Sequence, residues 1–383
     1  MLDITECARS MYVDVDRIRQ RVDEGPYDAI VAVSPENVTY LSGFYNMDLR
    51  LLPERVHVVV WPRHGEPAMV VMSRRASQLT ARDTFIEDVR GYQGEGLDMV
   101  RVLAGVLADH GLSKATIGIE ARCFPALYLN DLSRRLPGLR LEDAFDLLEG
   151  IRAIKTPAER ETIIRCNRIT CEAINTAFRS AQPGQTERQI AARMQFELLI
   201  AGADQINASL FSAGARTGIW HGMATDQRIE TGMVVKTDFG GFIDGYLSDI
   251  ARTAVMGRAT ARQRDLHARL TEVKHRIVDF VRPGLTAGEV ADFGRAAYVD
   301  AGLDFKWHIL GHGIGLALHE APQLYPWVVE PLQPGMLMMI EVGYSDYPND
   351  SFHVEDLVEV TVSGARYLTD ATEHQHIWEL GFA

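Results

Sequence analysis

A nine-residue pattern occurs twice in this chain, and it constrains the fold more than any other feature of the sequence. The segments PGQTERQIA (183–191) and PGLTAGEVA (283–291) lie one hundred residues apart and share P-G-x-T-x-x-[Q/E]-[I/V]-A. In each copy, the Thr and the Gln or Glu three residues later form a capping-box pattern, which begins a helix. An internal repeat of this kind indicates an architecture with two related halves.

The segments around each copy are also alike. A long amphipathic pattern precedes each copy, over 157–181 and 261–281, and predicts a helix. About 55 residues after each copy, an apolar strand pattern ends in an acidic residue, Asp238 in VVKTD and Glu341 in MLMMIE. The shared pattern alone is also typical of an ordinary helix start. The matching neighbours nevertheless favour two pseudo-symmetric α/β halves that face each other.

The first 150 residues instead alternate strand and helix patterns. Short β-branched runs cover 28–34, 57–62, 67–72 and 116–120, and helical patterns cover 97–111 and 124–136. This alternation predicts a smaller α/β domain with a largely buried sheet. It has no GxGxxG motif and no cluster of His, Cys or carboxylate residues, so we expect no chemistry there. The expected domains are therefore 1–150 and a catalytic domain over 151–383.

Composition limits the class of protein. The 383 residues are 46% hydrophobic and 24% charged, as in a soluble globular protein of two domains. No apolar run reaches the about 18 residues of a membrane span, and the N-terminal residues lack a secretory signal pattern. The net charge of −13 argues against nucleic-acid binding, and four cysteines without a CxxC pair predict reduced thiols. We expect a cytoplasmic protein.

Each half carries two acidic residues on an expected hairpin. Asp238 and Asp249 lie eleven residues apart around IDG, which is a turn pattern. A turn centred on Ile243–Asp244 would make them cross-strand partners. Glu341 and Glu355 lie fourteen residues apart across a longer loop. An unpaired carboxylate in such apolar strands would be energetically costly, so each pair needs a positive partner.

One acidic hairpin has simple explanations, such as a solvated face or a salt bridge to Arg252. Two acidic hairpins with a histidine between them instead predict a two-metal site. Carboxylate oxygens with a single nitrogen suit Mn²⁺, Co²⁺, Zn²⁺ or Fe²⁺, and four carboxylates balance the charge of two divalent ions. His312, in GHGIGLALHEAP (311–322), is the candidate nitrogen ligand. Its flanking glycines would let backbone and metal approach closely.

Further histidines lie close to these residues in the sequence. His221 in WHGMATDQRIETG is seventeen residues before Asp238, His319 in LALHE is seven residues after His312, and His308 lies in WHILGHG. A histidine that does not bind metal can donate a hydrogen bond to substrate or transfer a proton. This constellation favours such a role for His221 and His319. For His308, a structural role and a functional role are equally compatible with the sequence.

These motifs occur in the order HG, DFGG, DGYLSDIART, GHGIGLALHEAP, IEVG and HVEDLVEV, and they resemble those of the pita-bread metallohydrolases over residues 155–370. Members include prolidase, aminopeptidase P, methionine aminopeptidase and the non-peptidase relative creatinase. The resemblance implies an α+β pita-bread catalytic domain of two pseudo-symmetric α/β halves. A smaller α/β creatinase/prolidase-type N-terminal domain would precede it. It also implies a homodimer that acts on a short peptide or another small molecule.

The resemblance further assigns roles to the candidate residues. The five ligands of a dinuclear centre would be Asp238, Asp249, His312, Glu341 and Glu355, with Asp249 and Glu355 bridging the two ions. A hydroxide held between the metal ions would attack the scissile carbonyl, and Glu341 would relay its proton to the leaving nitrogen. His221 and His319 would stabilise the tetrahedral intermediate and position the substrate. All five ligand positions are retained, whereas creatinase-type members have lost metal ligands.

Two positions depart from the prolidase pattern. Prolidases usually read Glu-Pro-Gly where this chain has Val342 after Glu341, and they usually carry an arginine where it has His353. That arginine orders the site or the substrate carboxylate, so its absence weakens the dipeptidase prediction and leaves the metal prediction intact.

Two enzymatic hypotheses and one non-enzymatic hypothesis follow. The favoured one is an Xaa-Pro dipeptidase or an aminopeptidase P-like peptidase. The alternative is a C–N hydrolase or lyase of a small non-peptide metabolite, similar to creatinase or ectoine hydrolase. A binding protein derived from the fold is disfavoured, because the ligands and both catalytic histidines are intact.

Overall fold

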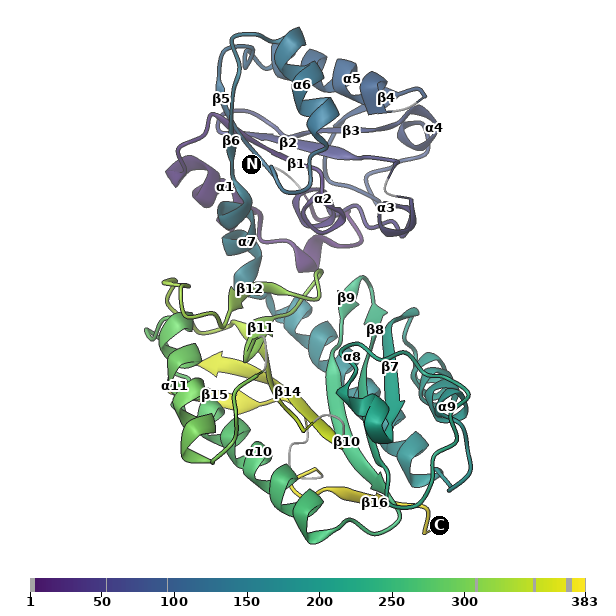
Figure 1. Cartoon of the computed structure of the whole chain (residues 1–383). Coiled ribbons are helices and arrows are strands. Elements are labelled where there is room, and N and C mark those ends of the chain that lie inside the picture. The colour runs from purple at the N-terminus through teal and green to yellow at the C-terminus, as the bar shows by residue number, and fades with distance from the viewer. Residues whose placement is uncertain are drawn as a thin grey trace. The chain divides into compact units, whose positions relative to one another are not determined.

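The computed structural model describes residues 4–52, 54–94, 96–306, 309–346, 349–369 and 374–382. The chain divides into two compact units (Figure 1). The N-terminal unit comprises Met1–Arg152 with Thr156–Ala158, and the C-terminal unit comprises Ala153–Lys155 with Glu159–Ala383. His308 lies outside the described residues, so both interpretations of it stay predictions.

The N-terminal unit contains a six-stranded mixed sheet in the order β4-β3-β2-β1-β5-β6. Its strands are β1 Ala29–Ala32, β2 Val58–Pro62, β3 Ala68–Met72, β4 Asp88–Tyr92, β5 Thr116–Ile119 and β6 Arg140–Asp143. The pairs β1–β2 and β2–β3 are antiparallel, and the other three pairs are parallel. The four central strands confirm the β-branched runs, whereas the sequence analysis missed β4 and β6. Both are edge strands that carry charged residues such as Arg90 and Arg140, so they lack the apolar run of a buried strand.

Helices surround this sheet (Figure 1). They are α1 Val15–Glu24, α2 Pro35–Ser42, α3 Asp48–Leu51, α4 Ser73–Ala76, α5 Gly96–Asp109, α6 Ala126–Arg135 and α7 Phe145–Ala153, with a 3₁₀ turn, η1, at Ser10–Tyr12. The helices α5 and α6 confirm the patterns predicted over 97–111 and 124–136. Leu103 and Leu107 of α5 are fully buried in one apolar cluster with Val31 and Val60 of the sheet.

The C-terminal unit contains two five-stranded sheets, each flanked by a pair of helices (Figure 1). The helices are α8 Pro157–Arg179, α9 Glu187–Ile200, α10 Ala261–Phe280 and α11 Ala287–Asp300. One sheet has the order β16-β10-β8-β7, with β9 paired to β8, and the other has the order β12-β11-β13-β14-β15.

The strands of the first sheet are β7 Gln205–Ala213, β8 Val234–Ile243, β9 Tyr246–Leu247, β10 Ile250–Met256 and β16 Trp378–Leu380, with a 3₁₀ turn, η2, at Gly214–Gly218. The strands of the second are β11 Gly311–Gly313, β12 Glu320–Gln323, β13 Leu337–Ser345, β14 Ser351–Thr361 and β15 Gly364–Tyr367. Strands β8 and β13 each pair antiparallel with a strand on either side, so they occupy matching places in the two sheets.

The two sheets and their helices confirm the pseudo-symmetric halves. Each repeat begins a fourteen-residue helix, α9 or α11, with a complete capping box at Thr186 or Thr286. Hydrogen bonds join the halves where β10 meets β14: the Thr253 hydroxyl donates to the His353 carbonyl and accepts from the His353 amide, both at 2.9 Å. These bonds hold the acidic strands of the two halves against each other.

A buried ionic cluster lies beside this junction. Arg252 forms an ion pair with Asp356 at 2.7 Å, and Lys274 forms a second ion pair with the same carboxylate. Although burial acts in the opposite direction, Arg252 and Lys274 hold the pKa of Asp356 below its usual range. The alternative that Arg252 neutralises the first acidic hairpin is therefore wrong, because its guanidinium pairs with Asp356 instead.

The stability of the C-terminal unit should depend on pH through a buried histidine of α10. Burial, together with nearby Lys274, lowers the pKa of His267 to about 3, whereas an unfolded histidine has a pKa of about 6.5. The unfolded chain therefore binds a proton that the folded chain excludes, and stability is lost as the pH falls below about 6.5.

We expect the unfolding free energy of the wild-type protein to decrease between about pH 7 and pH 5, and His267→Gln to make this decrease smaller by about 2 kcal/mol. Urea unfolding at both pH values measures this, and the exposed His64→Gln serves as the control that keeps the full decrease. If the unfolding free energy of His267→Gln decreases as much as that of the wild-type protein, the expectation is contradicted.

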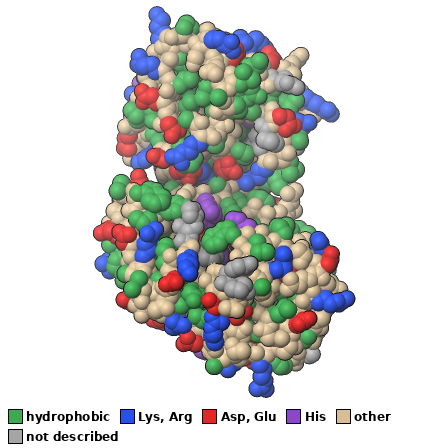
Figure 2. All heavy atoms as spheres, in the orientation of Figure 1, with side chains coloured by type: hydrophobic (Ala, Val, Ile, Leu, Met, Phe, Trp, Pro, Cys, Tyr) green, Lys and Arg blue, Asp and Glu red, His purple; other side chains and the backbone are tan. Residues whose placement is uncertain are grey.

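The surface mixes charges of both signs. On the face shown in Figure 2, acidic and basic side chains are interspersed over both units, and histidine side chains gather on the C-terminal unit. Among the described residues, no helix has the length and apolar character needed to cross a bilayer.

Candidate metal centre

The second acidic hairpin brings its two carboxylates together. Glu341 of β13 and Glu355 of β14 are directly opposite each other in an antiparallel ladder that runs from Leu337↔Glu359 to Ser345↔Ser351. Both side chains are buried, and Glu355 is only 1% exposed. The expected hairpin is confirmed, and like charges directly opposite are destabilising unless a cation joins them.

The first acidic hairpin has a different register from the expected one. Asp238 pairs with Ala251 rather than Asp249, because the turn is centred on Asp244 and Gly245. Both turn residues have positive φ, at 53° and 83°, as an Asp-Gly type I′ turn requires. The cross-strand prediction is therefore wrong by two residues. Asp249 lies between β9 and β10.

Glycine allows Asp249 to reach the site despite this register. A Cβ added to Gly240 of β8 would lie 1.9 Å from the carbonyl oxygen of Ser248, so any larger residue at position 240 would clash with the backbone next to Asp249. Glycine at this position lets that backbone pack directly against β8. The Asp249 amide donates to the Asn167 side chain of α8 at 3.2 Å. Ligand atoms of Asp238, Asp249 and Glu355 consequently lie within 4.8 Å of one another.

His312 lies on the short strand β11, between Gly311 and Gly313. An added Cβ would lie 2.3 Å from the carbonyl oxygen of Met339 at Gly311, and 2.3 Å from that of Ala321 at Gly313. The glycines therefore admit the neighbouring backbone, as expected, and the close approach of a metal stays a prediction. The His312 ring is held in place by a 3.0 Å hydrogen bond from Nδ1 to the Gly313 carbonyl.

Because Nδ1 donates to the Gly313 carbonyl, Nε2 is the ring nitrogen of His312 that is directed toward the carboxylates. Nε2 lies 3.8 Å from Asp249 Oδ2, 3.8 Å from Glu341 Oε1 and 3.7 Å from Glu355 Oε1. These distances exceed hydrogen-bond length, so Nε2 makes no hydrogen bond to these three oxygens. A cation between these atoms would bind them all.

The carboxylates also need a cation. Asp249 Oδ1 and Glu355 Oε1 are buried and accept no hydrogen bond from the described residues. Burial, reinforced by the neighbouring carboxylates, raises the pKa of both groups well above the usual range. Such groups are costly unless they are paired or coordinate a metal. Oxygen donors with one imidazole nitrogen suit a divalent ion, so the residues present fit the expected metal.

Three overlapping triplets could hold metal ions. They are Asp249–His312–His319, His312–Glu341–Glu355 and Asp238–Asp249–Glu355, and the ligand atoms in each lie within 4.8 Å of one another. The structure thus brings together all five residues that the sequence analysis singled out as ligands. It also places His319 within ligand distance of Asp249 and His312.

His319 is an exposed residue whose ring stacks on His312, with 4.0 Å between the ring centroids. Loss of water around the ring, followed by the proximity of His312, lowers the pKa of His319 to about 4. The ring is therefore neutral at physiological pH and can donate one hydrogen bond. The Glu320 carboxylate next to it is buried and binds Lys155 at 2.5 Å, which anchors this segment.

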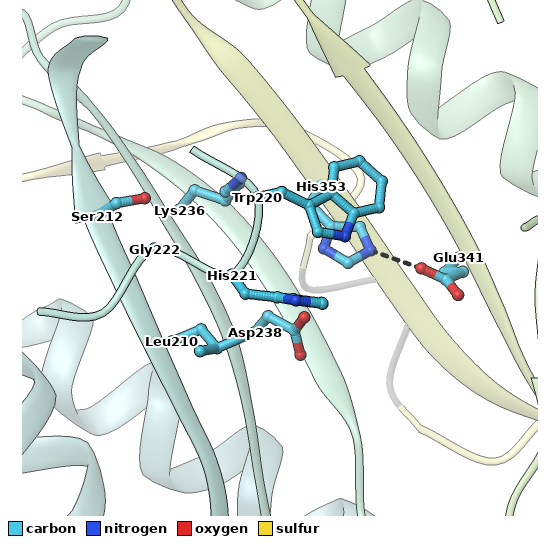
Figure 3. Close-up of a pocket in the computed structure, with 9 residues that line it drawn as sticks. All are labelled: Leu210, Ser212, Trp220, His221, Gly222, Lys236, Asp238, Glu341 and His353. Atoms are coloured by element: carbon cyan, nitrogen blue, oxygen red, sulfur yellow. Dashed lines mark hydrogen bonds and ion pairs between the residues drawn. The ribbon is translucent and has the colours of Figure 1, made fainter. Parts of the chain in front are cut away.

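A cavity of about 50 Å³ adjoins the acidic cluster and is lined by His221, Asp238, Glu341 and His353, among others (Figure 3). The His221 ring lies beside the Asp238 carboxylate in this view. His221 has a φ of 53°, which is uncommon for a residue other than glycine and is concentrated at functional sites. His353 Nε2 lies 3.2 Å from Glu341 Oε2, so the residue that replaces the expected arginine orients Glu341.

The sequence analysis overlooked Lys155, Lys236 and Ser212. Lys236 lines the cavity, and burial lowers its pKa to about 8 although Asp238 acts in the opposite direction, so it is mainly an ammonium at neutral pH. A charged residue inside the apolar run VVKTD was the signal that could have identified it. No comparable signal connects Lys155 to Glu320, because the two are 165 positions apart.

Two family models match this chain. The model described as metallopeptidase family M24 matches residues 161–362, and that of the creatinase/prolidase N-terminal domain matches residues 15–154. An Xaa-Pro dipeptidase from Pyrococcus furiosus is 34% identical over 226 residues, which are 58% of this chain and 65% of that protein. An Xaa-Pro dipeptidase from Pyrococcus horikoshii is 25% identical over 357 residues, which are 93% of this chain and 96% of that protein.

The chain is also similar to solved structures of a dipeptidase and a prolidase. The dipeptidase PepE from Mycobacterium ulcerans has a TM-score of 0.84 at 26% identity, with 95% of this chain and 96% of that chain covered. The prolidase from Pyrococcus furiosus has a TM-score of 0.78 at 26% identity, with 91% of this chain and 98% of that chain covered.

Proposed function

Because the chain belongs to metallopeptidase family M24, we propose that it hydrolyses the Xaa-Pro bond of short peptides. Family membership confirms the expected metal-dependent hydrolase and the pita-bread fold class with its creatinase/prolidase N-terminal domain. The observation that carries the proposal is that the buried Asp249 and Glu355 carboxylates lie beside His312 Nε2, and each has an oxygen that accepts no hydrogen bond from the described residues. Relatives described as Xaa-Pro dipeptidases support the substrate class.

We propose two divalent ions, of Mn²⁺, Co²⁺, Zn²⁺ or Fe²⁺, as the cofactor. The proposed ligands are Asp238, Asp249, His312, Glu341 and Glu355. Asp249, Glu355 and His312 each belong to two of the three overlapping triplets, and of these only the two carboxylates offer two oxygens, so we propose that Asp249 and Glu355 would be shared between the ions. Four carboxylates neutralise the charge of two such ions.

Bound divalent ions would supply Lewis-acid chemistry, acidifying a water molecule and polarising the substrate carbonyl. Glu341 faces both the cluster and the cavity, so its carboxylate can take up a proton and deliver it to the leaving nitrogen. His319, which is neutral at physiological pH, and His221 can each donate a hydrogen bond to the carbonyl oxygen as negative charge develops there. The hydrogen bond between His353 and Glu341 keeps the Glu341 carboxylate in place.

A metal-supplemented activity screen tests this function. We expect the protein incubated with Mn²⁺ or Co²⁺ to release proline from Xaa-Pro dipeptides, and the chelated protein to release none. The screen should pair dipeptides and tripeptides with ectoine-like and creatine-like compounds. The cavity of only about 50 Å³ keeps a small non-peptide metabolite as the second candidate substrate. Cleavage of such compounds without cleavage of any Xaa-Pro peptide would replace the proposal by the C–N hydrolase or lyase alternative.

A cytoplasmic location and a homodimer stay predictions, and we propose both. The four cysteines are free thiols, as is usual in a reducing compartment. Light scattering of the purified protein tests the homodimer.

A further inference from the structure

A cationic side chain faces the cavity next to the acidic cluster. In the β7–β8 ladder, Lys236 is directly opposite Ser212, and Asp238 is directly opposite Leu210. Residues two apart on a strand point to the same face, so Lys236 shares the face of Asp238. All four residues line the cavity, and Figure 3 shows Lys236 and Ser212 on the side away from Glu341.

The ammonium group of Lys236 is poorly satisfied by the protein. The residue is 9% exposed, and its Nζ donates to the Thr217 carbonyl at 2.6 Å. It forms no ion pair with any described residue, and a lysine ammonium has three donors. Asp238 lies on the same strand face but forms no ion pair with Lys236, so the ammonium keeps donors for a ligand that enters the cavity.

The charge balance of the site gives the sign of that ligand. Two divalent ions would neutralise the four carboxylates, an imidazole that binds a metal ion is neutral, and the attacking water enters without charge. Lys236 then leaves one positive charge. Among the described residues that line the cavity, it is the only lysine or arginine, because His353 replaces the arginine of the prolidase pattern. An anionic group of the substrate would complete the balance.

We propose that Lys236, assisted by the Ser212 hydroxyl, binds the carboxylate of a dipeptide substrate and makes this protein a dipeptidase. This inference rests on the proposed Xaa-Pro hydrolysis. In an Xaa-Pro dipeptide, the carboxylate is attached to the carbon next to the scissile nitrogen. A cation on the same strand face as Asp238 is therefore placed to contact it. In a longer peptide or a C-terminal amide, a neutral amide occupies this position and leaves Lys236 without a counter-charge.

The kinetic test compares Ala-Pro with alanyl-prolinamide and with Ala-Pro-Gly, using metal-loaded protein. We expect the wild-type protein to prefer Ala-Pro. Lys236→Met should lower kcat/KM for Ala-Pro by about 10- to 100-fold, the range for a charge-assisted hydrogen bond, while kcat/KM for the amide changes little. Lys236→Arg should keep most of the preference, and Ser212→Ala should lose a smaller part. Lys114→Met, at an exposed lysine of the N-terminal unit, is the matched control that leaves both substrates unaffected.

A binding measurement separates this inference from the proposed function. In calorimetric titrations, L-proline should bind the wild-type protein more tightly than L-prolinamide, and Lys236→Met should remove that difference. If the wild-type protein hydrolyses no Xaa-Pro peptide, the proposed function fails, yet the loss of this difference would still support a carboxylate site at Lys236. A preference for the carboxylate ligands that survives in folded Lys236→Met, or an equal weakening of acid and amide, would overturn the inference. Melting curves of Lys236→Met and Lys236→Arg establish that the variants are folded.

Discussion

We expect Asp249→Asn and Glu355→Gln each to abolish metal binding and turnover while the protein stays folded. Each carboxylate belongs to two of the three triplets that could hold metal, so a neutral amide would weaken both proposed metal positions at once. Each also has a buried oxygen with no hydrogen-bond partner among the described residues, so an amide can replace the carboxylate without breaking a hydrogen bond to that oxygen. Turnover should fall by at least about 10²–10³-fold. Elemental analysis of the purified variants measures the metal content. Full metal content in either variant would contradict the two-metal assignment.

The melting temperature of the metal-free protein is an independent test of the same site, and here we expect Asp249→Asn to stabilise the protein. Chelation should lower the melting temperature of the wild-type protein, because four carboxylates then repel one another in a largely buried site, and Mn²⁺, Co²⁺ or Zn²⁺ should restore it. Without metal, Asp249→Asn should melt above the wild-type protein, since one repelling charge is gone. Asp244→Asn is the matched control, because it makes the same change at the exposed turn of the same hairpin. It should keep full metal content and the full response to chelation.

The second large effect concerns the three histidines, whose alanine variants should fail in different ways. His312→Ala should lose metal and activity together, because the ring nitrogen that shares a triplet with Glu341 and Glu355 disappears. His221→Ala and His319→Ala should keep near-normal metal content and lose roughly 10²–10⁴-fold in kcat, the range for an acid–base or oxyanion partner. Metal stoichiometry, melting temperature and kcat measured on all three variants separate these outcomes.

His319 is the sharper part of this test. The structure places it in one triplet with Asp249 and His312, so loss of one equivalent of metal in His319→Ala would identify it as a ligand. A variant that is less stable but retains most of its turnover per folded molecule would indicate a packing role on His312. A fully active, normally metallated His319→Ala protein would exclude both functional interpretations.

Many features of the fold could be read from the sequence because they depend on neighbouring residues. Capping boxes at Thr186 and Thr286 are completed by residues three positions later, so the duplication identified α9 and α11. Apolar runs identified the central strands of the N-terminal sheet. The edge strands β4 and β6 were missed because partial exposure to solvent permits charged residues there. The turn after β8 was misplaced by one residue, because the choice between Ile243–Asp244 and Asp244–Gly245 depends on which residues adopt positive φ.

The sequence by itself determined which residue types gather in the C-terminal unit: two acidic hairpins, a histidine between glycines, and two further histidines. These are properties of short segments, and they lie within the residues that match the M24 family. Only the tertiary structure decided how the atoms face one another. The position of Asp249 next to Gly240, the direction of His312 Nε2 and the contact of the Lys236 ammonium with the Thr217 carbonyl each depend on segments that are separate in the chain. The physical reason is that the cost of burying a charge depends on its three-dimensional surroundings, which no single segment specifies.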